Sequence, residues 1–233
     1  MSADRAPQIK ALPSIRGLSE ASVWDYENGF YWFSHPTRLY KLLAHYELYR
    51  QIVQLPGDIF ELGVYKAASL IRLASFRALL ENDYSRKIVG FDSFGPFPTE
   101  HLQLASDREF VRRFEAAGGE GLCVEDARGI FVRKGFDNVF LFDGNVFETL
   151  PRYLHDNPAT RIAFLHLDMD VKEPTSFALQ LLYPRVVRDG LIVFDDYPTV
   201  AGETEAVDKF IADKNLKLEK LSHYSIPAYV RKQ

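Results

Sequence analysis

Short apolar runs alternate with longer segments of helical periodicity along most of the chain. The apolar runs are bounded by turn residues, as is typical of buried parallel strands, and they cover 58–64, 87–92, 138–143, 161–167 and 191–194. Helices are predicted at 36–55, 66–82, 106–117, 123–134, 174–187 and 204–213, with a shorter one at 145–156 that Pro151 interrupts. Residues 188–190 read as a turn before the last of these strands, and 217–221 and 226–231 predict a closing hairpin. This order predicts an α/β fold with a doubly wound, mostly parallel sheet and an antiparallel C-terminal edge.

The first 35 residues do not follow this alternation. Residues 1–19 mix Pro, Ser, Gly and charged residues without a period, which indicates a loose arm. Residues 20–34 are rich in aromatic side chains, and we expect them to pack over the core or against a second subunit, with a lid over the site as the alternative. We therefore expect an N-terminal arm or lid segment at 1–35 and a single domain at 36–233.

Composition indicates an ordinary globular protein and excludes several partners. With 233 residues, 47% apolar and 26% charged, the chain suits one sizeable domain. Its net charge of −4 provides no long-range attraction to nucleic acid or to an anionic membrane. The single cysteine, Cys123, excludes a disulfide within the chain and argues against a cysteine-based zinc site. No apolar run approaches the ~20 residues that span a bilayer, and residues 1–5 show no signal-peptide pattern, so we expect a cytoplasmic protein.

Acidic residues follow two of the predicted strands directly. Asp168 and Asp170 come after the run 161–167, and Asp195 and Asp196 come after the next predicted strand. In an open α/β sheet, ligands bind beyond the carboxyl ends of the strands, so these acids are expected to meet at one crevice. Their charges would repel one another there, and a hard divalent cation is the simplest partner for them.

The first two predicted strands also end in residues suited to a ligand. Gly63 allows close backbone approach after the first strand, beside Glu61, and Asp92 after the second strand suits a ribose diol. Taken singly, either acid is at least as well explained as a structural cap. As a pair on adjacent strand ends, the two acids favour ligand binding. The chain has no Gly-x-Gly-x-x-Gly and no P-loop Lys-Ser/Thr pair, which argues against NAD and nucleoside triphosphates.

Six motifs occur in the order found in one enzyme family: Gly57-Asp58-Ile59-Phe60-Glu61-Leu62-Gly63-Val64, Val89-Gly90-Phe91-Asp92-Ser93-Phe94, Leu165-His166-Leu167-Asp168-Met169-Asp170, Glu173-Pro174-Thr175, Leu182-Tyr183-Pro184-Arg185 and Asp195-Asp196-Tyr197. In them the chain resembles the TylF (macrocin O-methyltransferase) family of class I S-adenosylmethionine (SAM) enzymes, from about residue 36 to 210. The resemblance implies a seven-stranded, Rossmann-like methyltransferase sheet, a bound Mg2+, transfer of methyl from SAM to a sugar hydroxyl, and a homo-oligomer.

The resemblance also assigns roles to individual residues. It implies contacts to SAM from Glu61 and Gly63 at the methionine part, Ser69 beside it, Asp92 at the ribose, Ser93 and Phe94 at the adenine, and Asp143 near the adenine amine. It implies a metal held by Asp168, Asp195 and Asp196. The chain departs from the family at 66–69, where Lys-Ala-Ala-Ser stands in place of the common Arg-Gly-Gly-Ser, and the two alanines reduce backbone freedom beside the methionine carboxylate.

A sugar hydroxyl is a poor nucleophile because its pKa lies far above neutral. A divalent cation (Mg2+, or alternatively Mn2+ or Fe2+) lowers the pKa of a bound oxygen, and a nearby carboxylate can take the proton. Asp168 is the first candidate to be both ligand and base, and Asp170 is the alternative base. His166 shares a strand face with Asp168 and is a candidate base or SAM contact, with a structural histidine equally open.

Two other functions stay open on the sequence. One is a Mg2+-dependent phosphohydrolase with its nucleophile in Asp168-Met169-Asp170, although such motifs follow the first strand and this one follows the fourth. The other is a non-catalytic module that binds SAM or a nucleotide. For the methyltransferase, the acceptor sugar could be nucleotide-linked, part of a natural product or part of a surface glycan. A nucleotide-linked sugar would need a basic contact, and Arg112, Arg113, Arg185 and Arg188 read as solvated helix faces.

Overall fold

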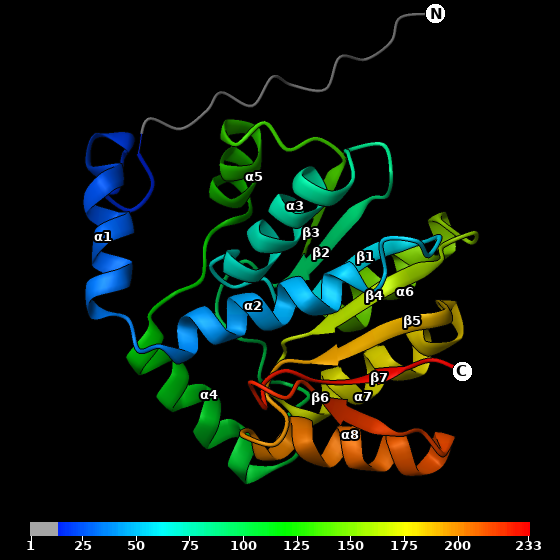
Figure 1. Ribbon diagram of the computed structural model, residues 1–233. Helices are drawn as coiled ribbons and strands as arrows, with labels where there is room; N and C mark the ends of the chain where they lie inside the picture. Colours follow the sequence, from blue (N-terminus) through cyan, green and yellow to red (C-terminus); the bar gives the residue numbers. More distant parts are fainter. Residues whose placement is uncertain (1–13) are drawn as a thin grey trace, which may run out of the picture.

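A computed structural model describes residues 14–233 (Figure 1). Its strands form one sheet in the order β3-β2-β1-β4-β5-β7-β6. The strands are β1 (Asp58–Leu62), β2 (Ile88–Asp92), β3 (Val139–Asp143), β4 (Ile162–Leu167), β5 (Val186–Phe194), β6 (Leu218–Lys220) and β7 (Ala228–Arg231). The first five are parallel, and β7 runs antiparallel to both β5 and β6. The predicted seven-stranded, doubly wound sheet with an antiparallel C-terminal hairpin is confirmed.

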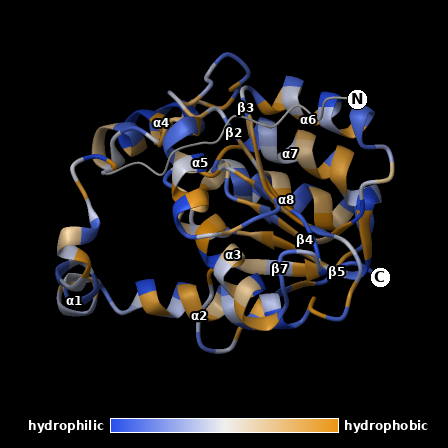
Figure 2. Ribbon diagram, turned by 90° about the horizontal axis from the view of Figure 1, so that it is seen from above, coloured by the Kyte–Doolittle hydropathy of each residue, from blue (hydrophilic) through white to orange (hydrophobic). Residues whose placement is uncertain are grey.

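Helices cover both faces of this sheet. They are α1 (Val23–Phe33), α2 (Thr37–Arg50), α3 (Ala68–Leu80), α4 (Ala105–Gly118), α5 (Val124–Arg133), α6 (Val146–Asp156), α7 (Lys172–Leu182) and α8 (Ala201–Lys214), with short 3-10 turns η1 (Glu20–Ser22) and η2 (Tyr183–Arg185). Side chains of α2, α3 and α5 form one apolar core with the sheet, and those of α6, α7 and α8 form the other. Alternate residues of each strand point to opposite faces, so Ile59 joins the first core and Phe60 the second. Figure 2 shows apolar residues gathered in the strands and on the helix faces toward them.

The helix predicted at 174–187 is shorter in the structure. It ends at Leu182, and Pro184 follows in η2. Proline has no backbone N–H to donate to the preceding turn of the helix, which explains the early end. The predicted turn at 188–190 lies inside β5, where Asp189 has a φ of 63° and the register with β4 shifts. Pro151 is accommodated inside a continuous α6, so the predicted interruption there is wrong.

The register brings the carboxyl ends of the central strands level. Leu62 of β1 pairs with Leu167 of β4, and Leu167 pairs with Phe194 of β5. Parallel strands that end in register deliver the next residues of each chain segment to the same edge. Gly63, Asp168 and the residues after Phe194 are therefore neighbours in space.

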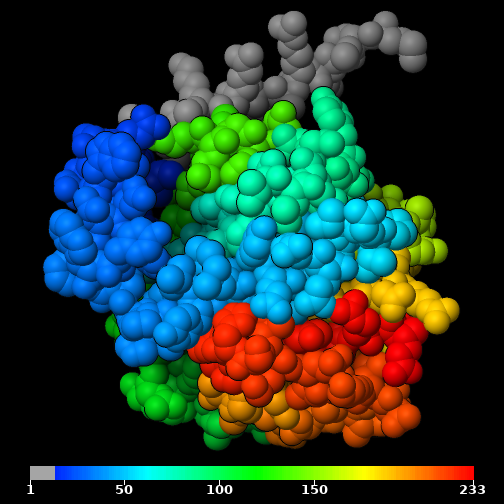
Figure 3. Space-filling view, viewed as in Figure 1, coloured from blue at the N-terminus to red at the C-terminus, as the bar shows by residue number. Residues whose placement is uncertain are grey.

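The aromatic N-terminal segment does not cover the core. No residue of α1 is buried, and Trp24 and Phe33 are 74% and 85% exposed. Figures 1 and 2 show α1 standing away from the sheet, and its side chains form the left-hand margin of the molecule in Figure 3. The expectation of packing over the core is wrong, whereas contact with a second subunit stays a prediction. The predicted loose arm falls mostly on residues 1–13, outside the described residues.

None of the helices between residues 14 and 233 is both long and apolar enough to cross a membrane.

Candidate functional site

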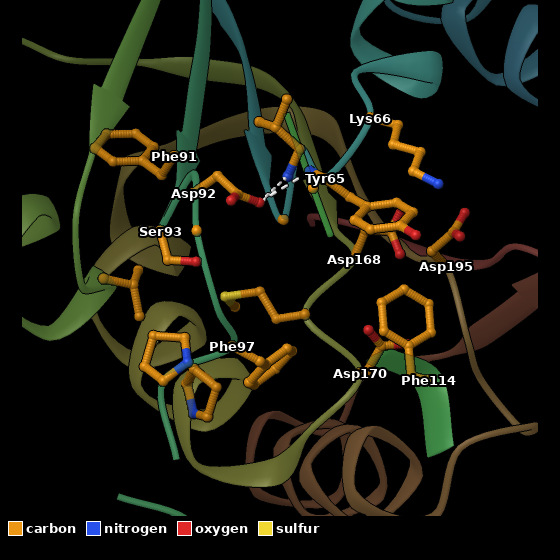
Figure 4. A pocket seen from close by; sticks show the side chains of 18 of the residues that line it. Tyr65, Lys66, Phe91, Asp92, Ser93, Phe97, Phe114, Asp168, Asp170 and Asp195 are labelled. Carbon is orange, nitrogen blue, oxygen red and sulfur yellow. Dashed lines mark hydrogen bonds between the residues drawn. The ribbon is translucent and has the colours of Figure 1, made fainter. Parts of the chain in front are cut away.

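A cavity of about 640 Å³ opens beyond the carboxyl ends of β1, β2, β4 and β5 (Figure 4). This is the position where ligands bind in open α/β sheets, and the volume lies in the range of small-molecule sites. Asp92 and Ser93 lie on one side of the cavity, and Asp168 and Asp195 lie on the other. The cavity therefore has two ends with different chemistry.

Three carboxylates meet at one of these ends. Each of Asp168, Asp195 and Asp196 offers an oxygen, and these oxygens all lie within 4.8 Å of one another. Backbone hydrogen bonds fix the positions, because the Asp168 N–H donates to the Leu62 carbonyl at 2.8 Å and the Asp195 N–H donates to the Leu167 carbonyl at 3.0 Å. The prediction that acids from two distant stretches meet at one edge is confirmed, and their role as metal ligands stays a prediction.

The acids of this cluster titrate in different directions. Burial, and then the charge of Asp195, raises the pKa of Asp168 well above its ordinary value. Burial, and then the charge of Asp196, does the same for Asp170. The pKa of Asp195 is held well below its ordinary value although burial opposes this, because His166, His45 and Lys41 contact its carboxylate. Part of the cluster therefore resists ionisation unless positive charge is nearby.

Behind the cavity wall, His166 joins the ends of three strands. Its Nδ1 lies 3.0 Å from Glu61 Oε2 and its Nε2 lies 3.2 Å from Asp195 Oδ1. All three side chains are at most 1% exposed. Burial opposes the charged imidazole, yet the hydrogen bonds to Asp195 and Glu61 raise the pKa of His166 well above its ordinary value. The imidazolium thus links β1, β4 and β5 directly behind the acid cluster.

Two further side chains complete this buried network. Ser69 at the start of α3 donates to Glu61 Oε1 at 2.9 Å. His45 of α2 lies 3.4 Å from Asp195 Oδ1, and burial lowers its pKa to about 4, so it is neutral near pH 7. Asp195 is consequently contacted from helix α2 and strand β4, and Glu61 and Ser69 extend the network to β1 and α3.

The opposite end of the cavity is organised by Asp92. Its Oδ2 accepts the N–H groups of Val64 and Tyr65 at 2.7 and 2.9 Å, and its Oδ1 accepts the N–H of Phe94 at 2.7 Å (Figure 4). These three bonds fix the loops after β1 and β2 and hold the carboxylate at the cavity. Gly63 precedes this turn with a φ of 92°, and a Cβ there would lie 1.8 Å from the Asp168 carbonyl oxygen.

The site residues predicted from sequence divide into two groups. Those that line the cavity are Gly63, Ser69, Asp92, Ser93, Asp168, Asp170, Asp195 and Asp196. Glu61, Phe94, Asp143 and His166 are not among the lining residues. Glu61 and His166 use their polar atoms on each other and on the network behind the wall, and the Phe94 side chain belongs to the apolar core. Asp143 is exposed at the end of β3, so the structure does not bring it to the cavity.

Basic residues also line the cavity, and of these only Lys66 belongs to a motif singled out in the sequence, at 66–69. They are Arg38 and Lys41 of α2, Lys66 just before α3, and Arg72 of α3. Lys41 forms an ion pair with Asp195 Oδ2, inside the acid cluster. Burial opposes the ammonium, but the neighbouring Asp195 and Asp168 raise the pKa of Lys41 above its ordinary value. The signal was present in the sequence as polar residues at 38, 41 and 45, which is one face of a helix.

The sequence model of the macrocin O-methyltransferase (TylF) family matches residues 37–231. Over 148 residues the chain is 35% identical to the 8-demethyl-8-(2,3-dimethoxy-alpha-L-rhamnosyl)-tetracenomycin-C 4'-O-methyltransferase of Streptomyces olivaceus, a match that covers 61% of this chain and 54% of that protein. It is 30% identical over 179 residues to the demethyldecarbamoylnovobiocin O-methyltransferase of Streptomyces niveus, which covers 71% of this chain and 64% of that protein. The matches thus span between about half and two thirds of the length of these relatives.

Among solved structures, the chain is similar to the apo structure of CalS11, described as a TDP-rhamnose 3'-O-methyltransferase of calicheamicin biosynthesis. The identity is 31% and the TM-score is 0.65, with 91% of this chain and 87% of that chain covered. The similarity therefore extends over most of the chain.

Proposed function

Because the chain belongs to the macrocin O-methyltransferase (TylF) family, we propose that it transfers the methyl group of SAM to a hydroxyl group of a sugar. One observation carries the proposal: the oxygens of Asp168, Asp195 and Asp196 lie within 4.8 Å of one another at a cavity that Gly63 and Asp92 also line. The donor end and the acid cluster therefore share one space. Family membership favours methyl transfer over phosphoester hydrolysis, the alternative raised by Asp168-Met169-Asp170.

SAM binds, in this proposal, at the end of the cavity formed by the loops after β1 and β2. The Asp92 carboxylate accepts from the ribose hydroxyls, with Ser93 toward the adenine. Gly63 and Ser69 face the methionine part, where the missing Cβ of Gly63 lets the ligand approach the backbone. Glu61 acts indirectly, because its two oxygens hold Ser69 and His166.

The acid cluster fits a divalent cation. Three carboxylates supply the hard oxygen ligands that Mg2+, Mn2+ and Fe2+ accept. Behind them, Glu203 has a buried Oε2 without a hydrogen-bond partner within residues 14–233, and its Oε1 accepts the Asp196 N–H at 3.2 Å. We propose that Asp168, Asp195 and Asp196 hold Mg2+, with Mn2+ and Fe2+ as alternatives. Such a cation lowers the pKa of the acceptor hydroxyl and orients it.

The protein's own residues account for the remaining steps. The acceptor oxygen forms a bond to the methyl carbon as the carbon–sulfur bond breaks, and sulfur keeps the electron pair. The hydroxyl proton passes to a carboxylate, for which Asp168 is the first candidate and Asp170 the alternative. Burial raises the pKa of both in the metal-free protein, where each takes up a proton more readily than a solvated aspartate, and a cation held by Asp168 would lower its pKa again. Rigid strand ends hold the two substrates in line.

The test combines SAM binding with methyl transfer. Calorimetry with SAM, in Mg2+ and in EDTA, is followed by radiolabelled methyl transfer to a panel of nucleotide sugars and glycosides. We expect SAM to bind, transfer to at least one sugar to require the cation, and Asp168→Asn and Asp196→Asn to abolish transfer while leaving the ribose end intact. Binding of SAM with no transfer to any sugar would instead support a non-catalytic SAM-binding module.

The proposal also covers the domain boundaries and the oligomeric state of the protein. We assign catalysis to residues 36–233 and an accessory role to residues 1–35. The exposed aromatic side chains of α1 suit contact with a second copy of the chain, because interface cores are enriched in such residues.

A further inference from the structure

Two arginines on neighbouring helices face the cavity without an acidic partner. Arg38 of α2 and Arg72 of α3 both line it, and neither makes an ion pair or side-chain hydrogen bond within the described residues. Other arginines of the described chain do have such partners: Arg77 pairs with Asp83, and Arg86 pairs with Glu81. Arg72 is half-buried, and the neighbouring charge of Arg38 adds to burial in lowering its pKa. Arg38 is exposed, so the pair is partly open to solvent, and an anion between the two guanidinium groups would reduce their mutual repulsion.

The position of this pair relative to the acid cluster restricts which anion it meets. Arg38 lies one helical turn before Lys41, which contacts Asp195. Arg72 lies one turn after Ser69 on α3. Lys66 points toward the acid-cluster side of the cavity in Figure 4. Arg38 and Arg72 therefore border the acid cluster, where a methyl acceptor would react, and Arg72 also lies near Ser69, which the proposed function places at the methionine part of SAM.

An acceptor with negative charge needs such a feature in this protein. The chain as a whole carries a charge of −4, so its long-range field does not attract an anion. The carboxylates of the cluster would repel a phosphate at short range. A neutral glycoside has no charge for these cations to meet, whereas a phosphate gives both guanidinium groups a partner in addition to the more distant Asp195, Glu61 and Asp168, whose charges act on Arg72. Planar guanidinium groups bind phosphate oxygens in bidentate fashion, which suits two arginines facing one group.

We propose that Arg38 and Arg72 form an anion subsite that binds the diphosphate of a nucleotide-linked sugar, the class of acceptor on which this methyltransferase acts. The inference rests on the proposed function and narrows it from three classes of sugar to one. The diphosphate is attached at one side of the sugar ring, and a hydroxyl on the other side of the ring reaches the acid cluster. Arg38 and Arg72 are thus specificity-determining residues that bind the acceptor away from the reacting atoms.

The same chemistry has a second source, because the methionine carboxylate of SAM is also an anion. The two sources separate in steady-state kinetics and calorimetry on the full chain. We expect Arg38→Ala and Arg72→Met each to raise the KM for nucleotide sugars about ten- to a hundredfold, while the Kd for SAM and the kcat change less than about threefold. Arg72→Lys should recover part of the loss. Arg113→Ala is the matched control, since Arg113 is exposed, pairs with Glu109 on α4 and does not line the cavity.

A binding assay makes the proposal independent of catalysis. Inorganic pyrophosphate is titrated into the EDTA-treated protein by calorimetry. We expect measurable binding that the control variant retains and the Arg38→Ala/Arg72→Met double variant loses. A fall in SAM affinity in the two single variants would assign the pair to the donor and overturn the proposal. Equal transfer to nucleotide sugars by wild type and variants would overturn it as well. If no sugar is methylated at all, the proposed function fails, and the pyrophosphate titration still decides whether the pair binds anions.

Discussion

At Gly63 the backbone of the loop after β1 passes directly against the backbone after β4. The residue has a φ of 92°, and an added Cβ would lie 1.8 Å from the carbonyl oxygen of Asp168. A glycine at this point lets two strand ends approach closely, and this closeness brings the loop after β1 and the acid cluster to one cavity. Glycine is thus required at position 63 because of a contact between segments about a hundred residues apart.

We expect Gly63→Ala to destabilise the fold by more than about 3 kcal/mol, because the positive φ and the clash with backbone add together. Urea denaturation monitored by circular dichroism measures the change. Gly135→Ala is the control, since Gly135 has a φ of 65° but no atom within 4 Å of its would-be Cβ, so it should lose only about 1–2 kcal/mol. Equal losses in the two variants would contradict the close approach.

Substitution of His166 tests how much the buried network of Glu61, His166 and Asp195 contributes to stability. Its removal leaves the carboxylates of Glu61 and Asp195 without their shared cationic partner, and we expect His166→Ala to cost about 3–5 kcal/mol of unfolding free energy. Glu61→Gln in the same background should cost less than it does in wild type, because the partner is already gone. Exposed His155→Ala, on α6, should change stability by less than about 0.5 kcal/mol. Strict additivity of the His166 and Glu61 substitutions would show that the two do not interact.

The position of a single residue could be predicted from sequence where the order of strands and helices alone determines it. Asp168 and Asp195 follow the apolar runs that become β4 and β5, so their meeting at the sheet edge could be deduced. Glu61 could not be assigned in this way, because its burial behind the cavity depends on a hydrogen bond to His166, 105 positions away. For Asp143 the prediction failed for a different reason. This residue ends a strand as the other acids do, but its strand, β3, lies at the edge of the sheet, away from the cavity.

At the scale of elements, the apolar periodicity located every helix and strand of the predicted domain. The largest error lies at residues 183–187, where Pro184 ends the helix and β5 starts earlier. For α2 the apolar positions predicted a helix but not its opposite face. Arg38 and Lys41 line the cavity, His45 contacts Asp195 behind it, and only the packing of α2 over the sheet shows this. A helix can therefore be predicted correctly while its functional face is missed.

The exposure of α1 leads to a prediction about assembly. Trp24, Trp32 and Phe33 are 74%, 70% and 85% exposed, and a cluster of such side chains on one helix marks a contact surface. We expect wild type to sediment as an oligomer at micromolar concentration, and Trp32→Ser/Phe33→Ser to shift it toward monomer without loss of secondary structure. Tyr84→Ser, 97% exposed between α3 and β2, is the control and should not change assembly. A monomeric wild type would remove this role from α1.

At the scale of the whole molecule, folding buries the strand ends together, whereas the carboxylates at those ends repel one another. The sheet aligns several strand ends, and the sequence places a carboxylate after most of them, so burial brings like charges together. The basic residues of α2 and α3 and the imidazolium of His166 compensate part of this charge. The strand pattern revealed the acids, whereas the compensating groups come from helices whose tertiary packing the pattern does not encode. Stability and ligand binding must therefore be coupled through charge.

This coupling predicts how stability depends on pH and on a cation. Burial and neighbouring carboxylates raise the pKa of Asp168 and Asp170 above the ordinary value of 3.8, so the folded state binds more protons than the unfolded chain in the window between the two values. Their contribution is fully favourable below pH 3.8 and is lost as pH rises through the raised pKa. Asp195 has the opposite sign, because its lowered pKa contributes stability that is fully present above pH 3.8 and is lost as pH falls through the lowered pKa. In EDTA, unfolding free energy should therefore peak at mildly acidic pH and fall toward neutral.

Added Mg2+ should remove that fall, because a cation held by the acid cluster neutralises the charges that oppose folding. Urea midpoints measured from pH 5 to 8, in EDTA and in excess Mg2+, give two curves whose separation should widen as pH rises. Asp168→Asn removes one of the repelling charges, so it should flatten the EDTA curve and reduce the gain from Mg2+ together. Glu109→Gln, whose side chain is exposed on α4 and pairs with Arg112 and Arg113, should leave both curves in place. Coincident curves would mean that the cluster holds no cation, and the metal-dependent mechanism would have to be abandoned while the fold stood. A flat curve in EDTA would mean that the raised pKa values are absent.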